Sequence, residues 1–372
     1  MILEGHILTP QGFVQGRLVH DGGRVLAVEG RPVSAQAARA DADAIVLPGF
    51  VDLHVHGGGG ADTMEAGDAI HRIAGLHVRH GTTSMLATTM TAPMGEIESA
   101  LQALRPACDT RPAGTARVLG VHLEGPYINA GKLGAQPDFA RATSVAEILS
   151  LHAMAPIRLI TLAPEVAGNL ELIGPLRAAG FRVQLGHTLG SYEDGVAALA
   201  KGAGGFTHLF NAMTGLHHRA PGMAGAALAH AQYSEIIPDL LHVHPGAIRV
   251  ALRAIPCLYC VTDSTAAAGM PDGDYRLGRH VVTKCLGGVR LADGTLAGST
   301  LTMDQALRNL VSLGLALDDA SRRVATFAAD YLGLPERGRL QPGAFADAVV
   351  LNRELQLQRV IVEGEEIDLA HA

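Results

Sequence analysis

From residue 45 onward, short apolar runs alternate with longer segments that have helical periodicity. This alternation predicts parallel strands that are joined by crossover helices. The eight expected strands are Ile45–Val55, Thr83–Thr89, Arg117–Leu123, Ile157–Leu162, Arg182–Leu185, Gly205–Leu209, Glu235–His242 and Leu258–Thr262. The clearest helical segments between them are Ala69–His80, Ile97–Leu104, Val145–Met154, Leu170–Ala179, Ser191–Lys201 and Pro245–Ala254. Eight strand–helix units predict an α/β protein with a (β/α)8 barrel of the TIM type, and a doubly wound open sheet is the alternative.

The two ends of the chain differ in character from the part between them. Short β-type runs separated by glycines occur at Ile2–Thr9, Arg17–His20, Arg24–Glu29, Ala348–Leu351 and Gln358–Val362. Because two distant segments share this composition, we expect them to pair with each other. The expected organisation is a small β-sandwich domain of residues 1–47 and 338–372 beside a barrel of residues 48–337. The alternative is that these strands only decorate the barrel.

The charge of the chain limits its partners. The net charge is -7 and lysine and arginine form no cluster, so we expect no nucleic-acid partner. The only lysines are Lys132, Lys201 and Lys284, and none completes a Gly-x-x-x-x-Gly-Lys loop, which excludes the phosphate-loop NTPases. Any anionic ligand must therefore be bound by a few local groups.

The sequence also predicts where the protein is located. No apolar run reaches the ~18 residues that a membrane span needs, and Met1–His6 lacks a basic region followed by an apolar stretch. The four cysteines are too few and too irregularly spaced for a disulfide framework. We therefore expect a cytoplasmic protein that has no membrane partner.

Residues that can bind a metal or move a proton stand at the ends of six expected strands. In a TIM-type barrel the active site lies at the carboxyl ends of the strands, where such side chains would meet. They are His54 and His56 on the first strand, Glu124 on the third, His187 on the fifth, His208 on the sixth, His242 on the seventh and Asp263 on the eighth. A single histidine beside an apolar run is more often structural than a ligand. Recurrence at six strand ends instead predicts a metal site with a carboxylate beside it.

Longer motifs around these residues carry a family resemblance. They are Pro48–Gly57 (PGFVDLHVHG), His80–Thr83 (HGTT), His122–Tyr127 (HLEGPY), Gly186–Thr188 (GHT), His208–Met213 (HLFNAM) and Val261–Gly269 (VTDSTAAAG). Together these motifs extend over nearly the whole chain. Because of them, the chain resembles members of the amidohydrolase superfamily. The motifs that contain Glu124 and His208 are specific to the amino-sugar-phosphate deacetylases of that superfamily, whereas Asp-x-His-x-His alone would mark only the wider group.

The resemblance implies a principal divalent metal bound by Glu124, His187 and His208, with one position left open for water. His54 and His56, with Glu124 able to bridge, would form a second site, so one or two metals are expected per subunit. Zn2+ is the expected ion, and Fe2+, Co2+ and Mn2+ are the alternatives. Three protein ligands and an open position are also what catalytic zinc requires on chemical grounds.

Asp263 is the residue that we expect to act as general base and general acid. An amide has a weakly electrophilic carbonyl and a poor leaving group, so the site must activate water and then protonate nitrogen. One carboxylate can take a proton from the attacking water and later return it to the amine. The structural alternative is that Asp263 caps the segment that follows it.

The resemblance also implies residues that bind the substrate. Arg219 and His242 would reach the phosphate from the neighbouring subunit of a homodimer, and Asn211 and the backbone of Ala212 would add further contacts. A guanidinium group suits this role because it binds phosphate in a bidentate way. The alternatives are that Arg219 is a solvated loop residue and His242 a packed one. Gln136 stands where the family usually has a substrate-contacting histidine, which puts the identity of the sugar in doubt.

The reaction that the resemblance implies is hydrolysis of N-acetyl-D-glucosamine 6-phosphate, an amino-sugar phosphate, to D-glucosamine 6-phosphate and acetate in amino-sugar catabolism. One alternative is N-acetylgalactosamine 6-phosphate or another N-acyl substrate. Another is a lyase or isomerase that uses the same ligands. The last is a barrel that binds metal and sugar without turnover.

Overall fold

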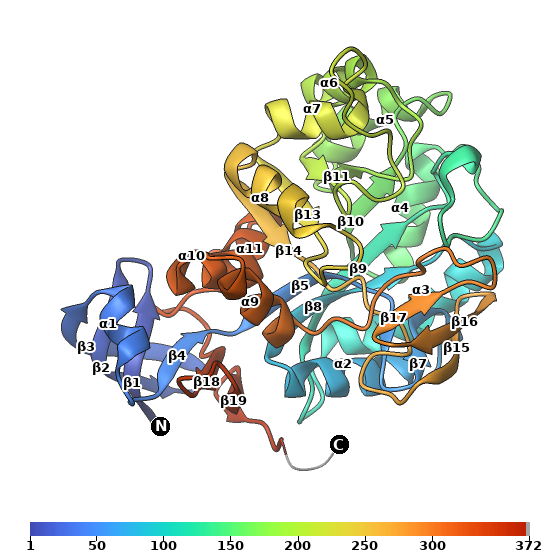
Figure 1. Ribbon diagram of the computed structural model, residues 1–372. Coiled ribbons are helices and arrows are strands. Elements are labelled where there is room, and N and C mark those ends of the chain that lie inside the picture. Colours follow the sequence, from blue (N-terminus) through green and yellow to red (C-terminus); the bar gives the residue numbers. More distant parts are fainter. Residues whose placement is uncertain (370–372) are drawn as a thin grey trace.

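The computed structural model describes residues 1–369 and builds them around two large sheets (Figure 1). The seven-stranded sheet has the order β20-β19-β18-β4-β1-β2-β3. Its strands are β1 (Ile2–Thr9), β2 (Gly12–Asp21), β3 (Arg24–Val33), β4 (Ile45–Pro48), β18 (Ala348–Leu351), β19 (Leu357–Val362) and β20 (Glu365–Glu366), and α1 (Ala35–Ala40) precedes β4. Segments from both ends of the sequence therefore share one sheet, coloured blue and red in Figure 1. Residues 370–372 of the predicted terminal segment lie outside the described residues.

Strand β4 contributes to two hydrophobic cores, because successive side chains of a strand point to opposite faces. Val46 packs into the small core of the seven-stranded sheet. Ile45 and Leu47 belong to the large core that extends through the rest of the protein. The prediction of one strand at Ile45–Val55 is therefore wrong, because β4 and β5 (Phe50–Val55) belong to different sheets.

The second large sheet is parallel, with the order β12-β11-β10-β9-β8-β5. Its other strands are β8 (Thr82–Thr89), β9 (Arg117–Glu124), β10 (Ile157–Leu162), β11 (Arg182–Leu185) and β12 (Gly205–Phe206). The connecting helices are α2 (Ala69–Arg79), α3 (Met94–Asp109), α4 (Val145–Met154), α5 (Asn169–Ala178) and α6 (Tyr192–Lys201). Every residue of β5 and β8 is buried, as in parallel sheets that are covered on both faces. The predicted α/β class is confirmed.

Two further parallel strands, β13 (Tyr233–Ile236) and β14 (Cys257–Cys260), form a pair with α8 (Pro245–Ala254) between them. Hydrogen bonds connect this pair to both edges of the six-stranded sheet. The backbone N of Leu209 donates to the carbonyl of Glu235 at 3.0 Å, and the backbone N of Asp263 donates to the carbonyl of His54 at 2.9 Å. The predicted seventh strand is wrong beyond Ile236, because the chain turns there into a loop that carries His242.

Several elements were not predicted from the sequence. They are α1, β20, α7 (Gly222–His230), β15 (Gly273–Leu277), β16 (His280–Cys285), β17 (Gly288–Arg290), α9 (Met303–Ser312), α10 (Leu317–Ser321), the π-helical turn η3 (Arg322–Thr326), α11 (Phe327–Leu332) and the short pieces β6 (Gly57–Gly58), β7 (Ala61–Asp62), η1 (Thr63–Glu65) and η2 (Ala130–Lys132). Strands β15–β17 form a three-stranded antiparallel sheet, and Leu277 at the end of β15 reaches the cavity described below.

Local signals explain where the connecting helices begin and end. Helix α6 starts at Ser191, whose hydroxyl accepts from the backbone N of Asp194 while the Asp194 carboxylate accepts from the backbone N of Ser191. Such a reciprocal pair satisfies two free donors at a helix start. The same helix ends at Gly202, where φ is 104° and glycine has no steric cost. Among the described residues, none of the helices has the length and apolar character needed to cross a membrane.

Candidate metal centre and active site

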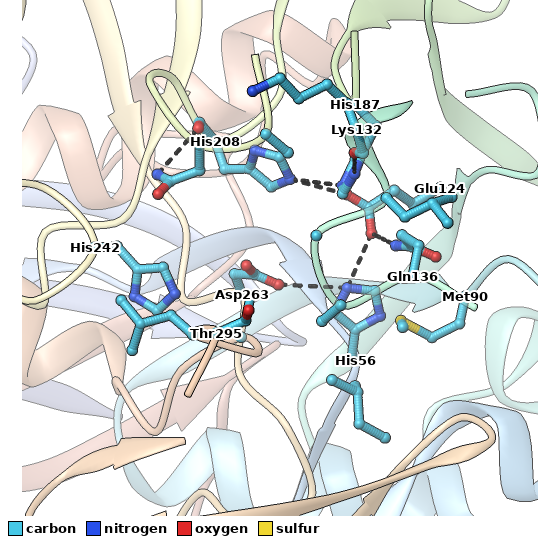
Figure 2. Close-up of a pocket in the computed structure, with 18 of the residues that line it drawn as sticks. His56, Met90, Glu124, Lys132, Gln136, His187, His208, His242, Asp263 and Thr295 are labelled. Carbon is cyan, nitrogen blue, oxygen red and sulfur yellow. Dashed lines mark hydrogen bonds and ion pairs between the residues drawn. The ribbon is translucent and has the colours of Figure 1, made fainter. Parts of the chain in front are cut away.

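The carboxyl ends of the parallel strands surround a cavity of about 390 Å³. His56, Glu124, His187, His208 and Asp263 line it, each at or just after the end of a different strand (Figure 2). Figure 2 shows the rings of His187 and His208 directed at Glu124, and Asp263 facing His56. Side chains that are far apart in the sequence therefore meet at one place, as the strand-end pattern predicts.

Glu124, His187 and His208 form the inner group of this cavity. Oε1 of Glu124 lies 3.2 Å from Nε2 of His187 and 3.2 Å from Nε2 of His208, and these two nitrogens are 3.1 Å apart. Nδ1 of His187 lies 2.9 Å from the carbonyl oxygen of Lys132, which can only accept a hydrogen bond. In the neutral ring the proton therefore sits on Nδ1, and the lone pair of Nε2 points into the group.

His54, His56 and Asp263 form a second group beside the first. The Nε2 atoms of His54 and His56 are 3.2 Å apart, and they lie 3.4 and 3.3 Å from Oδ1 of Asp263. Glu124 stands between the two groups. Its Oε1 is 3.5 Å from Nε2 of His54, and its Oε2 is 3.1 Å from Nε2 of His56.

Both groups fit a divalent cation. The side chains are buried, and within each group the candidate ligand atoms all lie within 4.8 Å of one another. Zinc bonds of about 2.0–2.1 Å in a tetrahedral arrangement separate neighbouring ligand atoms by roughly 3.3 Å, close to the spacing in this site. Two imidazole nitrogens that face each other across 3.1 Å need a cation or a proton between them. Imidazole together with carboxylate is a ligand set that suits Zn2+ and related ions.

The buried charges shift the pKa values of these groups in opposite directions. Burial alone would raise the pKa of Glu124, but the imidazoles of His54 and His187 hold it well below its ordinary value. Burial also opposes ionisation of Asp263, yet His54 and His56 lower its pKa to about 2. Burial lowers the pKa of His56, but its contacts with Asp263 and Glu124 raise it to about 9. Both carboxylates are therefore ionised at neutral pH, which is the form that binds a cation.

Three residues of the site have a backbone conformation that favours glycine. The φ angle is 49° at His187, 30° at His208 and 50° at Asp263. A positive φ in a non-glycine residue is uncommon and costs on the order of 1–3 kcal/mol. Each of the three stands just beyond the end of its strand, where the chain turns to bring the side chain into the cavity. Strain of this kind, gathered at one place, is typical of a functional site.

The structure brings four of the five predicted substrate-binding residues to the cavity wall, namely Gln136, Asn211, Ala212 and His242. His242 lines the cavity of its own chain, so the expectation that it reaches in from a neighbouring subunit is wrong. Its Nδ1 lies 2.7 Å from Oδ2 of Asp239. Arg219 is exposed and outside the cavity of its own chain, and its Nη1 lies 2.7 Å from Nε2 of His218.

Gln136 contacts the ligand group directly. Its Nε2 donates to Oε2 of Glu124 at 2.6 Å, and its Oε1 accepts from the backbone N of Thr91 at 2.7 Å. The sequence placed this residue beside the substrate but did not predict the contact with Glu124.

Glu235 is a residue that the sequence analysis missed. It is fully buried in β13, and its Oε2 lies 3.0 Å from Nδ1 of His54. A glutamate inside an expected strand was the available signal, because glutamate is almost never fully buried unless it is paired. The carbonyl of Lys132, which orients His187, carries no side-chain signal that sequence reasoning could use.

Comparisons with known proteins agree with this geometry. The pattern described as the amidohydrolase family matches residues 45–367. The N-acetylgalactosamine-6-phosphate deacetylase of Escherichia coli O157:H7 is 38% identical over 96% of this chain and 97% of its own length. The N-acetylglucosamine-6-phosphate deacetylase of Lysinibacillus sphaericus is 37% identical over 86% of this chain and 84% of its own length.

Solved structures show the same similarity in three dimensions. A mutant N-acetyl-D-glucosamine-6-phosphate deacetylase from Mycobacterium smegmatis, in complex with N-acetyl-D-glucosamine-6-phosphate, has a TM-score of 0.91 and 35% identity, with 99% of both chains covered. The N-acetylglucosamine-6-phosphate deacetylase of Thermotoga maritima has a TM-score of 0.90 and 32% identity, again with 99% of both chains covered.

Proposed function

The chain belongs to the amidohydrolase family, and from that premise we propose that it hydrolyses N-acetyl-D-glucosamine 6-phosphate to D-glucosamine 6-phosphate and acetate in amino-sugar catabolism. The observation that carries this proposal is the meeting of Glu124, His187 and His208 within 3.2 Å of one another, beside the carboxylate of Asp263 in one cavity. A cation site next to a proton acceptor is what hydrolysis of an unreactive amide requires. Relatives with this activity in their names support the choice of substrate.

Two sets of residues would hold the metal. Glu124, His187 and His208 would bind the principal cation, and His54 and His56 a second one, with Glu124 between them. We infer one or two divalent ions per subunit, with Zn2+ as the first choice and Fe2+, Co2+ or Mn2+ as alternatives. When bound, such an ion polarises a carbonyl oxygen and lowers the pKa of water.

Asp263 is the catalytic residue of this proposal. Its carboxylate is ionised at neutral pH, because its pKa is about 2, and it faces the cavity. It takes a proton from the water that attacks the acetyl carbon. As the carbon–nitrogen bond breaks, Asp263 returns that proton to the leaving amine, so that water is consumed and acetate and a free amine are released.

The phosphate would be bound at the outer wall of the cavity. We assign it to His242, Asn211 and the backbone of Ala212, which line that wall. Burial lowers the pKa of His242, but the Asp239 carboxylate outweighs this and raises it, which favours a positive charge there. Arg219 would complete the site from the neighbouring subunit of a homodimer, since it is exposed and does not line the cavity of its own chain.

The finer description of the fold belongs to the same proposal. We infer that β13 and β14 close the six-stranded sheet into a (β/α)8 barrel of residues 48–337, and that residues 1–47 together with the described part of 338–372 form a small β-sandwich domain beside it. The backbone hydrogen bonds from Leu209 to Glu235 and from Asp263 to His54 support closure, because they join the strand pair to both edges of the larger sheet. The cytoplasmic location stays a prediction.

N-acetyl-D-galactosamine 6-phosphate is the second candidate substrate. A relative that is 38% identical over nearly the whole chain bears that activity in its name, and Gln136 stands at the cavity in place of the expected histidine. The two sugars differ only in the configuration at one hydroxyl. A single altered contact to that hydroxyl is therefore enough to change the preference.

Steady-state assays of acetate release with both phosphorylated sugars and with unphosphorylated N-acetylglucosamine test the proposal. We expect kcat/KM to be highest for N-acetylglucosamine 6-phosphate. A higher value for the galactosamine compound would establish the second candidate instead. Equal turnover without the phosphate would remove the role given to Arg219 and His242, and no turnover of any of the three would refute the deacetylase assignment.

A further inference from the structure

Glu235 is a buried carboxylate that contacts residues from both candidate metal groups. Its Oε2 lies 3.0 Å from Nδ1 of His54 and accepts a hydrogen bond of 3.2 Å from the backbone N of His208. Its Oε1 lies 3.5 Å from the hydroxyl of Tyr259. Burying a carboxylate costs several kcal/mol unless charged or polar partners compensate, so a fully buried one that contacts two ligand residues calls for a specific role.

The contact with Glu235 fixes which nitrogen of His54 carries a proton. An ionised carboxylate can only accept, so the ring must donate from Nδ1. In the neutral ring the lone pair is then on Nε2, at the opposite end from Glu235. That nitrogen lies 3.2 Å from Nε2 of His56 and 3.5 Å from Oε1 of Glu124, where a second cation would be bound.

We propose that Glu235 is the positioning residue of the second cation site. It holds His54 as the tautomer that is protonated on Nδ1 and fixes the ring so that Nε2 faces His56 and Glu124. Through the same oxygen it holds the backbone of His208, so one atom sets the relative position of a ligand in each group. The inference rests on the proposed function in one respect: it takes a cation to be bound at His54 and His56.

At the site of His54 and His56, the geometry separates this role from that of a direct ligand. Glu235 meets His54 at Nδ1, whereas His56 and Asp263 face Nε2 of the same ring. A cation held by His54 and His56 would therefore be bound through the ring nitrogen opposite Glu235. A carboxylate on the far nitrogen of a ligating histidine orients the ring and makes the ligating nitrogen more basic, and its loss typically weakens metal binding about 10- to 100-fold.

Three variants separate the contributions of this carboxylate. Glu235→Leu has a similar volume and removes both hydrogen bonds of Oε2. Glu235→Gln keeps a neutral acceptor oxygen opposite Nδ1 of His54, and it is the conservative variant that should preserve part of the metal affinity. Tyr259→Phe is the matched control, because it removes the hydroxyl beside Oε1 without changing the contact with His54. Thermal unfolding of all four metal-free proteins establishes that each is folded.

The measurement is titration of the metal-free proteins with Zn2+ against a chromophoric chelator, which gives the number of sites and the affinity of each. We expect two sites in the wild type and in Tyr259→Phe. In Glu235→Leu the Zn2+ affinity of one site should fall at least tenfold, while the affinity of the other site stays at the wild-type value. The affinity of the weakened site in Glu235→Gln should lie between the values for the wild type and for Glu235→Leu. Nitrogen NMR of the imidazoles should show a ring protonated on Nδ1 that is absent in Glu235→Leu and in a His54→Gln reference.

Several outcomes would overturn the proposal. Two sites of unchanged affinity in a folded Glu235→Leu would show that the carboxylate is only structural. A wild type that deacetylates its substrate with a single Zn2+ would leave the proposed function intact and refute the role of Glu235. A wild type that binds two Zn2+ ions but hydrolyses none of the sugars would refute the proposed function, while the affinities of the variants would still decide the role of Glu235.

Discussion

Nε2 of Gln136 donates a hydrogen bond of 2.6 Å to Oε2 of Glu124, while the backbone N of Thr91 donates to the other end of the same amide at 2.7 Å. The amide can be oriented in only one way, because the backbone N–H of Thr91 is always a donor. Gln136 therefore contacts one carboxylate oxygen, and the other faces His187 and His208. The residue that was expected beside the substrate therefore also contacts the centre of the ligand group.

Two substitutions of Gln136 separate its two contacts. Gln136→Leu leaves the buried N–H of Thr91 without a partner, so we expect the free energy of unfolding to fall by about 1–3 kcal/mol. Gln136→Glu keeps an acceptor for Thr91 but places a second carboxylate against Glu124, so metal affinity should change by at least tenfold from the wild-type value. Urea unfolding and metal titration check the pair. Wild-type metal affinity in Gln136→Glu would show that the contact with Glu124 does not influence the site.

Replacing Asp263 by asparagine tests the proton transfer. The amide keeps the shape of the side chain but cannot accept and return a proton, so kcat should fall at least the ~100-fold that is typical of losing a general acid and base. The principal metal should be retained, because Glu124, His187 and His208 are unchanged, and elemental analysis of the purified variant checks this. If most of the activity survived with the metal in place, Asp263 would have no part in the mechanism.

The buried imidazole of His77 makes the stability of the protein depend on pH. Its ring is fully buried, with Nε2 at 3.0 Å from the carbonyl of Gly57, and burial lowers the pKa of His77 from 6.5 to about 4. Between these values the unfolded chain binds a proton that the folded chain does not. The free energy of unfolding should therefore fall as the pH is lowered from about 6.5 to 4, by roughly 3 kcal/mol from this group, and the contribution should level off below that range.

The variant His77→Gln isolates this contribution. Glutamine can still donate to the carbonyl of Gly57 but does not titrate, so its stability should depend less steeply on pH over the same range. Urea unfolding of both metal-free proteins between pH 4.5 and 7 gives the two slopes. Parallel curves would mean that His77 is protonated as easily in the folded state as in the unfolded one.

The sequence predicted the site residues correctly where a histidine stands directly after an apolar run. His56, His187 and His208 follow apolar runs, and parallel strands bring their carboxyl ends together, so their meeting could be predicted without coordinates. The boundary between β4 and β5 could not, because both halves are apolar and the sheet to which each belongs depends on distant pairing with β18 and β8. Nor could the positive φ of Asp263, which is a backbone conformation that its residue type does not indicate.

The contacts that orient the candidate metal ligands were harder to predict from the sequence. The carbonyl of Lys132 orients His187 through the backbone, which every residue has, so no side chain indicates it. Gln136 lies 12 residues from its partner Glu124 and Glu235 lies 181 residues from His54, with no periodic spacing that links either pair, and only the fold brings each pair together. A residue that orients a ligand has no fixed position relative to the strands, so the sequence does not reveal it. A ligand at the end of a strand does have such a position.

Mixed dimers test the last element of the proposal, that Arg219 acts on the cavity of the other subunit. Arg219→Ala loses a charge-assisted contact to the phosphate, so kcat/KM should fall at least about tenfold. Asp263→Asn loses activity for a different reason, because it lacks the carboxylate that transfers the proton. In a heterodimer of the two, one cavity combines the intact Asp263 of the first chain with the intact Arg219 of the second. After subunit exchange at equal concentrations, random pairing restores about a quarter of all sites in a two-fold dimer.

His242 supplies the matched control for this experiment, because it lines the cavity of its own chain and therefore belongs to the same site as Asp263. A heterodimer of His242→Ala and Asp263→Asn contains no cavity in which both residues are intact, so mixing these two variants should give no recovery beyond the sum of the parents. Initial rates at substrate concentrations well below KM compare the two mixtures. Recovery in neither mixture would mean that Arg219 does not act across a subunit boundary, and its exposed position would then be that of an ordinary solvated loop residue.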